Sequence, residues 1–97
     1  MSQIIQIICG PTLVREVMEI FRAYEVRGYY RQDDMRAVEM SPAGGPSSST
    51  RMLKLSSLMV ILPTSQAQGV LDELRNLRRS MKKAGVFRVI TWTAETI

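Results

Sequence analysis

The sequence contains no histidine and only one cysteine among its 97 residues. These two residue types are the usual protein ligands of transition metals, so a built-in zinc or copper site is not expected. Cys9 has no second cysteine with which to form an internal disulfide, and this is typical of proteins of the reducing cytosol. We therefore expect a cytoplasmic protein without a resident metal.

Long apolar runs are absent from the N-terminal segment "MSQIIQIICGP". Its apolar run covers only Ile4 to Cys9, and no basic residue precedes it. Such a run is too short for a signal peptide or for a membrane span. We expect a chain that is not itself in the membrane.

Groups suited to catalysis are scarce. No histidine is present to act as a base, and the adjacent acids Asp33 and Asp34 are more typical of a solvated turn than of a catalytic pair. Cys9, which ends an apolar strand without a nearby base, is more typical of a small core residue than of a nucleophile. No glycine-rich phosphate-binding loop joins a strand to a helix. We expect that the protein is not an enzyme.

Aromatic residues make up only 6% of the chain. RNA-recognition domains of comparable size stack bases on aromatic side chains of their central strands. The apolar segment "LKLSSLMVIL" has none. We expect no nucleic-acid partner, although the net charge of +4 permits a small anionic one.

The first half of the chain predicts a strand, a helix and a second strand. Ile4 to Ile8 are apolar residues interrupted by glutamine and followed by Gly10 and Pro11, which indicates a buried strand. A second β-favouring run covers Val26 to Arg31. Between them, apolar residues at helical spacing predict an amphipathic helix with one buried face, formed by Leu13, Val17, Ile20, Phe21 and Tyr24.

The second half repeats this order. Met52 to Leu62 predicts a strand, Val86 to Trp92 predicts another, and a helical stripe lies between them. Ser65 and Gln68 have the spacing of a capping box, and Gly85 lies where a left-handed residue after the helix is expected. We predict a single α+β domain over residues 1–97 with the ferredoxin-like βαββαβ fold, in which two helices cover one face of a four-stranded antiparallel sheet.

A long segment separates the second strand from the third. Residues 41–50, "SPAGGPSSST", have almost nothing to bury, and we predict a mobile loop over residues 33–52. Two alternatives are that Asp33 to Met40 extend the second strand and that the segment is merely a tolerated surface loop.

Consecutive apolar residues from Leu58 to Leu62 indicate a strand with two faces to cover. The two helices can cover only one of them. We therefore expect a homo-oligomer, and specifically a trimer.

Basic residues gather near the end of the second helix, at Arg75, Arg78, Arg79, Lys82 and Lys83. A solvated outer face is the ordinary interpretation. The alternative is an anion site in which Lys82, Lys83 and Arg88 surround Gly85.

Three stretches, "AYEVRGYYR", "VILPTSQAQGVLDEL" and "KKAGVFRVITW", resemble the PII signalling superfamily and its shorter PII-like relatives. The resemblance extends over the layout of the whole chain. It implies a trimer with a ligand cleft between subunits and a mobile loop between the second and third strands. By position, it implies cleft roles for Gly28, Tyr29, Tyr30, Gly85, Phe87 and Arg88.

The family's Gly-Asp-Gly-Lys stretch is reduced here to "KKAGVF", and the tip of the loop has no tyrosine. The resemblance therefore implies a PII-like regulator with an altered ligand rather than a classical sensor. The implied effectors are an adenine nucleotide (ADP, ATP or AMP) or bicarbonate, and the implied partner is a membrane transporter or a metabolic enzyme. The alternatives are a ligand-free structural or assembly module and a small enzyme of acylphosphatase type, which would need a phosphate-binding arginine that "CGPTLVR" offers only inside the helix.

Overall fold

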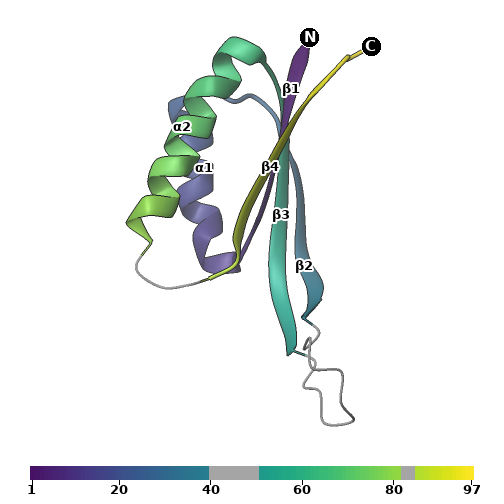
Figure 1. Cartoon of the computed structure of the whole chain (residues 1–97), viewed down its shortest axis with the longest axis vertical. Helices are drawn as coiled ribbons and strands as arrows, with labels where there is room; N and C mark the ends of the chain where they lie inside the picture. The colour runs from purple at the N-terminus through teal and green to yellow at the C-terminus, as the bar shows by residue number, and fades with distance from the viewer. Residues whose placement is uncertain (40–50, 82–84) are drawn as a thin grey trace.

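The protein is described by a computed structural model covering residues 1–39, 51–81 and 85–97. It contains four strands, two α-helices and a short 3₁₀ helix. Figure 1 shows both α-helices on one face of the sheet and both termini at the same end. The elements are β1 (Ser2–Cys9), η1 (Pro11–Leu13), α1 (Val14–Ala23), β2 (Tyr30–Glu39), β3 (Arg51–Pro63), α2 (Thr64–Ser80) and β4 (Phe87–Ala94).

The sheet has the strand order β2-β3-β1-β4, and every neighbouring pair is antiparallel. This order places each helix as the crossover between two strands that are parallel to each other but not adjacent. The predicted ferredoxin-like α+β fold is confirmed.

The core lies between the helices and one face of the sheet. Ile5 and Ile7 of β1 are fully buried there, as are Leu58 and Val60, their register partners on β3. The helices contribute apolar stripes to this core. Their buried members are Val14, Val17 and Phe21 of α1 and Ala67, Val70, Leu71 and Leu74 of α2. Of the face predicted for the first helix, only Val17 and Phe21 are buried, whereas Leu13, Ile20 and Tyr24 are partly buried.

The opposite face of the sheet is uncovered and largely apolar. Two cross-strand rows occupy it, because Ile4 pairs with both Ile61 and Trp92, and Gln6 pairs with both Met59 and Ile90. Trp92 is 40% exposed, and Ile61 and Ile90 are exposed to a similar degree. The predicted second apolar face of the third strand is therefore present in the folded chain.

The second strand begins later than predicted. Of the expected run from Val26 to Arg31, only its last two residues lie in β2. The Val26 N–H instead donates to the Phe21 carbonyl at 2.9 Å, and Glu25 has a left-handed φ of 54°. These features close α1 with a turn, so Val26 packs against the core and does not join the sheet.

Two predictions about α2 are wrong. The helix begins at Thr64 after Pro63, without a side-chain cap, so Ser65 lies inside it and the capping box does not form. At the other end, Met81 is already extended and Gly85 does not have a left-handed φ. The chain leaves α2 several residues before the glycine that was expected to end it.

The strands flanking the predicted loop are longer than expected. Asp33 to Glu39 lie in β2, as the alternative interpretation allowed, and β3 begins at Arg51, one residue before its predicted start at Met52. A register shift between Gln32 and Met35 interrupts the pairing, and Asp34 has a left-handed φ of 56°. Figure 1 shows β2 and β3 running beyond the helices. Residues 40–50 lie outside the described residues, so the prediction of mobility stays a prediction.

Candidate functional site

A cavity of about 570 Å³ lies between the second half of α2 and the beginning of β4. The packing of the helix against this edge strand leaves an opening beside the buried Leu71 and Leu74. Its residues come from both elements and from the segment just before β4. They are Leu71, Leu74, Arg75, Arg78, Gly85, Val86, Phe87, Arg88, Val89 and Thr91.

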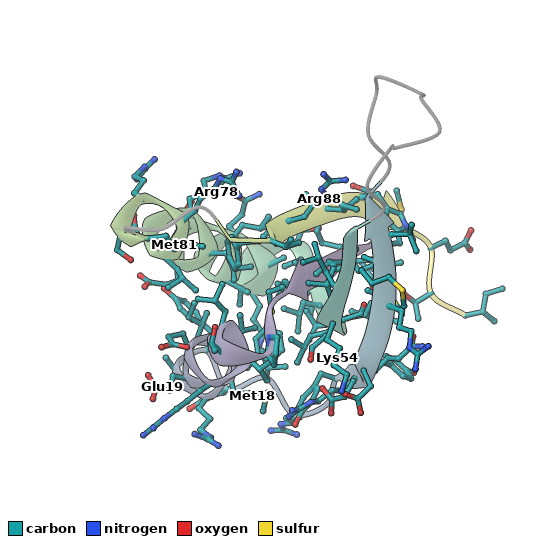
Figure 2. All side chains as sticks on the ribbon, turned by 90° about the horizontal axis from the view of Figure 1, so that it is seen from below. Met18, Glu19, Lys54, Arg78, Met81 and Arg88 are labelled. Atoms are coloured by element: carbon teal, nitrogen blue, oxygen red, sulfur yellow. The ribbon has the colours of Figure 1, made fainter. Side chains whose placement is uncertain are left out.

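Three arginines and no acidic residue are among the described residues that line this cavity. Arg78 donates from Nη1 to the carbonyl oxygen of Phe87, which ties α2 to the first residue of β4. Arg75 donates from Nη1 to Asp72 Oδ1 at 2.9 Å, with both side chains largely exposed. Figure 2 shows Arg78 and Arg88 along the same side of the molecule. The cavity is therefore cationic, and an anion is the ligand that its charge favours.

The side chains of Phe87 and Arg88 point to opposite faces of the sheet, as those of successive residues in a strand do. Phe87 is 4% exposed and belongs to the core, where it is the register partner of Cys9. Arg88 is exposed on the edge strand. Phe87 forms part of the cavity wall, but its burial leaves little ring surface on which a base could stack.

Gly28 lines a different hollow, of about 520 Å³, together with Tyr24 and Gln66. Gln66 is near the start of α2, whereas Arg75 and Arg78 are near its end. A single chain therefore does not bring the predicted Gly28 and Arg88 groups together.

The two tyrosines after Gly28 have separate environments. The Tyr29 ring packs on Phe21, with centroids 5.8 Å apart and planes tilted by 48°. Tyr30 is the register partner of Met59 on the uncovered face of the sheet and is 65% exposed. Both rings retain exposed surface that another subunit or a ligand could cover.

Lys82 and Lys83, the remaining predicted site residues, lie outside the described residues. Sequence reasoning noticed Arg75 and Arg78 in the basic cluster but did not place them in the site. Their spacing of three was the available signal, because residues three apart share one side of a helix. It could not show which side faces β4.

Cys9, which was considered as a nucleophile from the sequence, lies in surroundings that make its thiol unreactive. Cys9 is buried, and burial raises the pKa of its thiol to about 11, although the positive charge of Arg31 opposes the rise. A thiol with such a pKa stays protonated near neutral pH and is a poor nucleophile. No group of three metal-ligating side chains occurs in the part of the chain that the structure describes.

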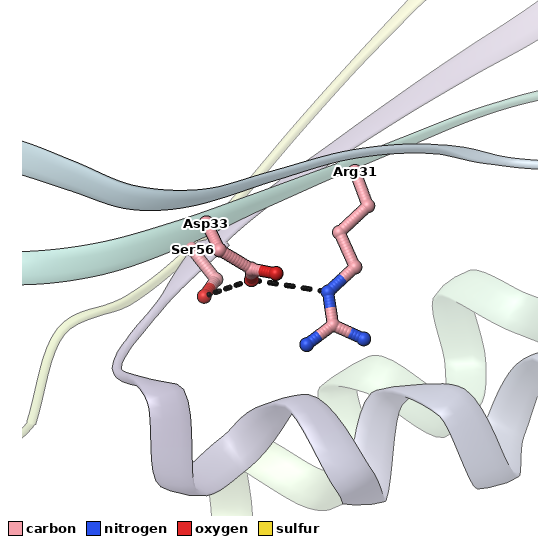
Figure 3. Close-up of polar contacts among 3 residues, drawn as sticks. All are labelled: Arg31, Asp33 and Ser56. Atoms are coloured by element: carbon pink, nitrogen blue, oxygen red, sulfur yellow. Dashed lines mark hydrogen bonds and ion pairs between the residues drawn. The ribbon is translucent and has the colours of Figure 1, made fainter.

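Asp33 takes part in a polar cluster that joins β2 to β3 (Figure 3). Its Oδ1 accepts hydrogen bonds from Arg31 Nε at 3.0 Å and from Ser56 Oγ at 2.9 Å. The bond from Arg31, followed by that from Ser56, lowers the pKa of the Asp33 carboxyl. The cluster lies beside the register shift in β2 and gives Asp33 a structural function in this bend.

Comparisons with known proteins support the fold assignment. No protein-family model and no curated protein matches the sequence. Among solved structures, B. subtilis GlnK in its ATP complex is 8% identical, with a TM-score of 0.71 over 94% of this chain and 79% of that one. CPII, a nitrogen regulatory PII-like protein from Thiomonas intermedia, bound to ADP, AMP and bicarbonate, is 14% identical, with a TM-score of 0.65 over 99% of this chain and 96% of that one.

The chain therefore has the fold of the PII proteins, as the resemblance predicted. Within the described residues, neither helix is both long and apolar enough to cross a membrane.

Proposed function

We propose that this chain, which has the PII fold, is a PII-like regulator that binds a small anionic metabolite between subunits. The observation that carries the proposal is the cavity between α2 and β4, which Arg75, Arg78 and Arg88 line without an acidic residue among the described lining. Arginine binds phosphate and carboxylate groups through paired N–H donors, which suits this cavity to either anion.

The proposed effectors are an adenine nucleotide and bicarbonate. CPII, which shares this fold, has been solved with ADP, AMP and bicarbonate bound. Arg88 would supply a charge-assisted hydrogen bond to the anion, with Gly85 allowing close approach of the backbone. On the sequence alone we add Lys82 and Lys83 as further contacts to a phosphate.

Completion of the site requires a second subunit. Gly28, Tyr29 and Tyr30 lie away from the arginine cavity in one chain, so a neighbour must supply them. The uncovered apolar rows on the sheet supply a reason to associate, because burial of apolar surface drives assembly. We propose a trimer, and sedimentation of a monomer at micromolar concentrations would contradict it.

Signalling would pass through the segment between β2 and β3. A ligand that contacts this segment in only one of its conformations would shift its equilibrium and expose or hide a binding surface. We propose that a cytoplasmic partner, such as a metabolic enzyme or the inner face of a transporter, reads this change and that the protein itself catalyses no reaction. Limited proteolysis between β2 and β3, with and without nucleotide, tests the coupling.

The decisive experiment measures ligand binding by calorimetry and by thermal shift with ADP, ATP, AMP and bicarbonate. Replacing Arg88→Ala should weaken binding of the anion by about 1.5–3 kcal/mol, the usual contribution of a charged hydrogen bond. Arg22→Ala is the matched control. Arg22 is an exposed arginine of α1, so its replacement removes the same charge at a position outside the cavity.

Equal weakening in both variants would indicate unspecific attraction to a basic protein. Unchanged affinity in Arg88→Ala, with wild-type melting, would remove Arg88 from the site. If no anion binds the wild-type oligomer, the ligand-free assembly module becomes the better interpretation, which the apolar sheet face favours.

A further inference from the structure

A groove of about 880 Å³ runs between α1 and α2, apart from the arginine cavity. None of its lining residues belongs to a strand, so it lies on the helical side of the molecule. Association through the uncovered sheet face would leave this groove accessible. Its lining consists of Glu16, Glu19, Ile20, Ala23, Tyr24, Glu73, Asn76, Leu77 and Ser80.

The apolar part of the groove comes from both helices. Ile20, Tyr24 and Leu77 pack against the core but remain only partly buried, so each presents apolar surface to the groove. Ala23, which is exposed, leaves room between them because of its small side chain. These residues form a short apolar strip between two helices.

The charge around this strip is opposite to that of the whole protein. Three of the nine acidic residues line the groove, whereas none of the thirteen Lys and Arg residues is among its described lining. Glu16 and Glu73 form no ion pair with any described residue, and the pair between Glu19 and Arg15 is long, at 3.6 Å, and exposed. Exposed pairs of this kind are weak and leave Glu19 available to another cation. Figure 2 shows Glu19 on α1, on the side away from the sheet.

From this arrangement we infer that the groove between α1 and α2 binds a basic amphipathic helix of a partner protein. The apolar stripe of that helix would lie on Ile20, Tyr24 and Leu77, and its flanking lysines or arginines would meet Glu16 and Glu73. Nucleic acids and anionic membranes are disfavoured because their phosphates would be repelled by the same carboxylates. The site is independent of the proposed metabolite cavity and requires no ligand there.

The probe is an amidated helical peptide of leucine and lysine, about five turns long, with all leucines on one face. Its affinity for the full chain is measured by fluorescence anisotropy at low salt, without nucleotide. The groove variant combines Glu16→Gln with Glu73→Gln. The control combines Asp72→Asn with Glu95→Gln, which changes the net charge equally but alters no residue of the groove.

The groove variant should bind the peptide about three- to tenfold more weakly than the control does, as expected for two exposed ion pairs lost. A second variant, Ala23→Lys, should bind the peptide more weakly than the groove variant does, because the substitution places a cation and a long side chain in the groove. Circular dichroism and sedimentation verify that each variant keeps the wild-type fold and assembly. Equal weakening in the groove variant and the control, unchanged affinity in Ala23→Lys, or no binding to the wild-type protein would each overturn the inference.

Discussion

Gly69 is the residue whose replacement tests the packing of α1 against α2 most directly. A Cβ atom placed on Gly69 would lie 2.3 Å from Tyr24 Cε1 and 2.9 Å from Tyr24 Cδ1. Both distances are well inside van der Waals contact, so the Tyr24 ring must move if alanine replaces the glycine. Overpacking of this kind usually costs about 1–3 kcal/mol.

An opposing effect comes from the helix itself. Gly69 lies inside α2, where alanine is favoured over glycine by about 1 kcal/mol. The net effect of Gly69→Ala should therefore lie between zero and about 2 kcal/mol of destabilisation. A single variant cannot separate the two terms, but a double-mutant cycle with Tyr24→Ala can.

In the Tyr24→Ala background the steric overlap is gone, so Gly69→Ala should stabilise the protein by about 1 kcal/mol. The coupling between the two sites should thus be about 1–3 kcal/mol. Chemical denaturation of all four proteins at one fixed concentration measures it, since association shifts apparent stability. Gln68→Ala, at an exposed position of the same helix, serves as the control. Equal effects of Gly69→Ala in both backgrounds would refute the close approach of Tyr24 to α2.

Two further predictions concern ionisable groups. Hydrogen bonds lower the pKa of Asp33 in the folded protein. The contribution of this residue to stability is therefore complete above the ordinary Asp pKa of about 3.9, and it is lost as pH falls through the lower pKa of the folded state. In Asp33→Asn, the melting temperature should depend less on pH over this acidic range. An unchanged dependence of the melting temperature on pH would contradict the cluster. Cys9, buried and with a pKa of about 11, should react with iodoacetamide at mildly alkaline pH only when the chain opens, so rapid labelling of the native protein would refute its burial.

The placement of the predicted ligand residues shows where sequence reasoning reached its limit. Gly85, Phe87 and Arg88 do line one cavity, and Arg75 and Arg78 join them from α2. Gly28 lies elsewhere. Sequence spacing could not reveal this separation, because it depends on which ends of α1, α2 and β4 the fold brings together.

Local competition for hydrogen bonds explains the errors at element boundaries. Val26 has strong β-propensity, but its N–H completes the end of α1, and Glu25 supplies the left-handed turn. Propensity describes what a residue tolerates, whereas the partner available to its N–H decides where it lies. Side chains contribute as well, because the Asp33 carboxylate of β2 accepts a hydrogen bond from Ser56 Oγ on β3 beside the register shift.

The sequence by itself determined the order of the elements, the sides of the helices that enter the core and the presence of an uncovered apolar sheet face. These features follow from the periodicities of apolar residues, 3.6 in helices and two in strands, which are local properties of the chain. Only the tertiary structure decided that Arg75, Arg78 and Arg88 line one cavity, that Phe87 lies in the core, and that Glu16 and Glu73 border one groove. Each of these depends on how helices sit against strands or against each other, and side-chain packing between distant segments determines that geometry.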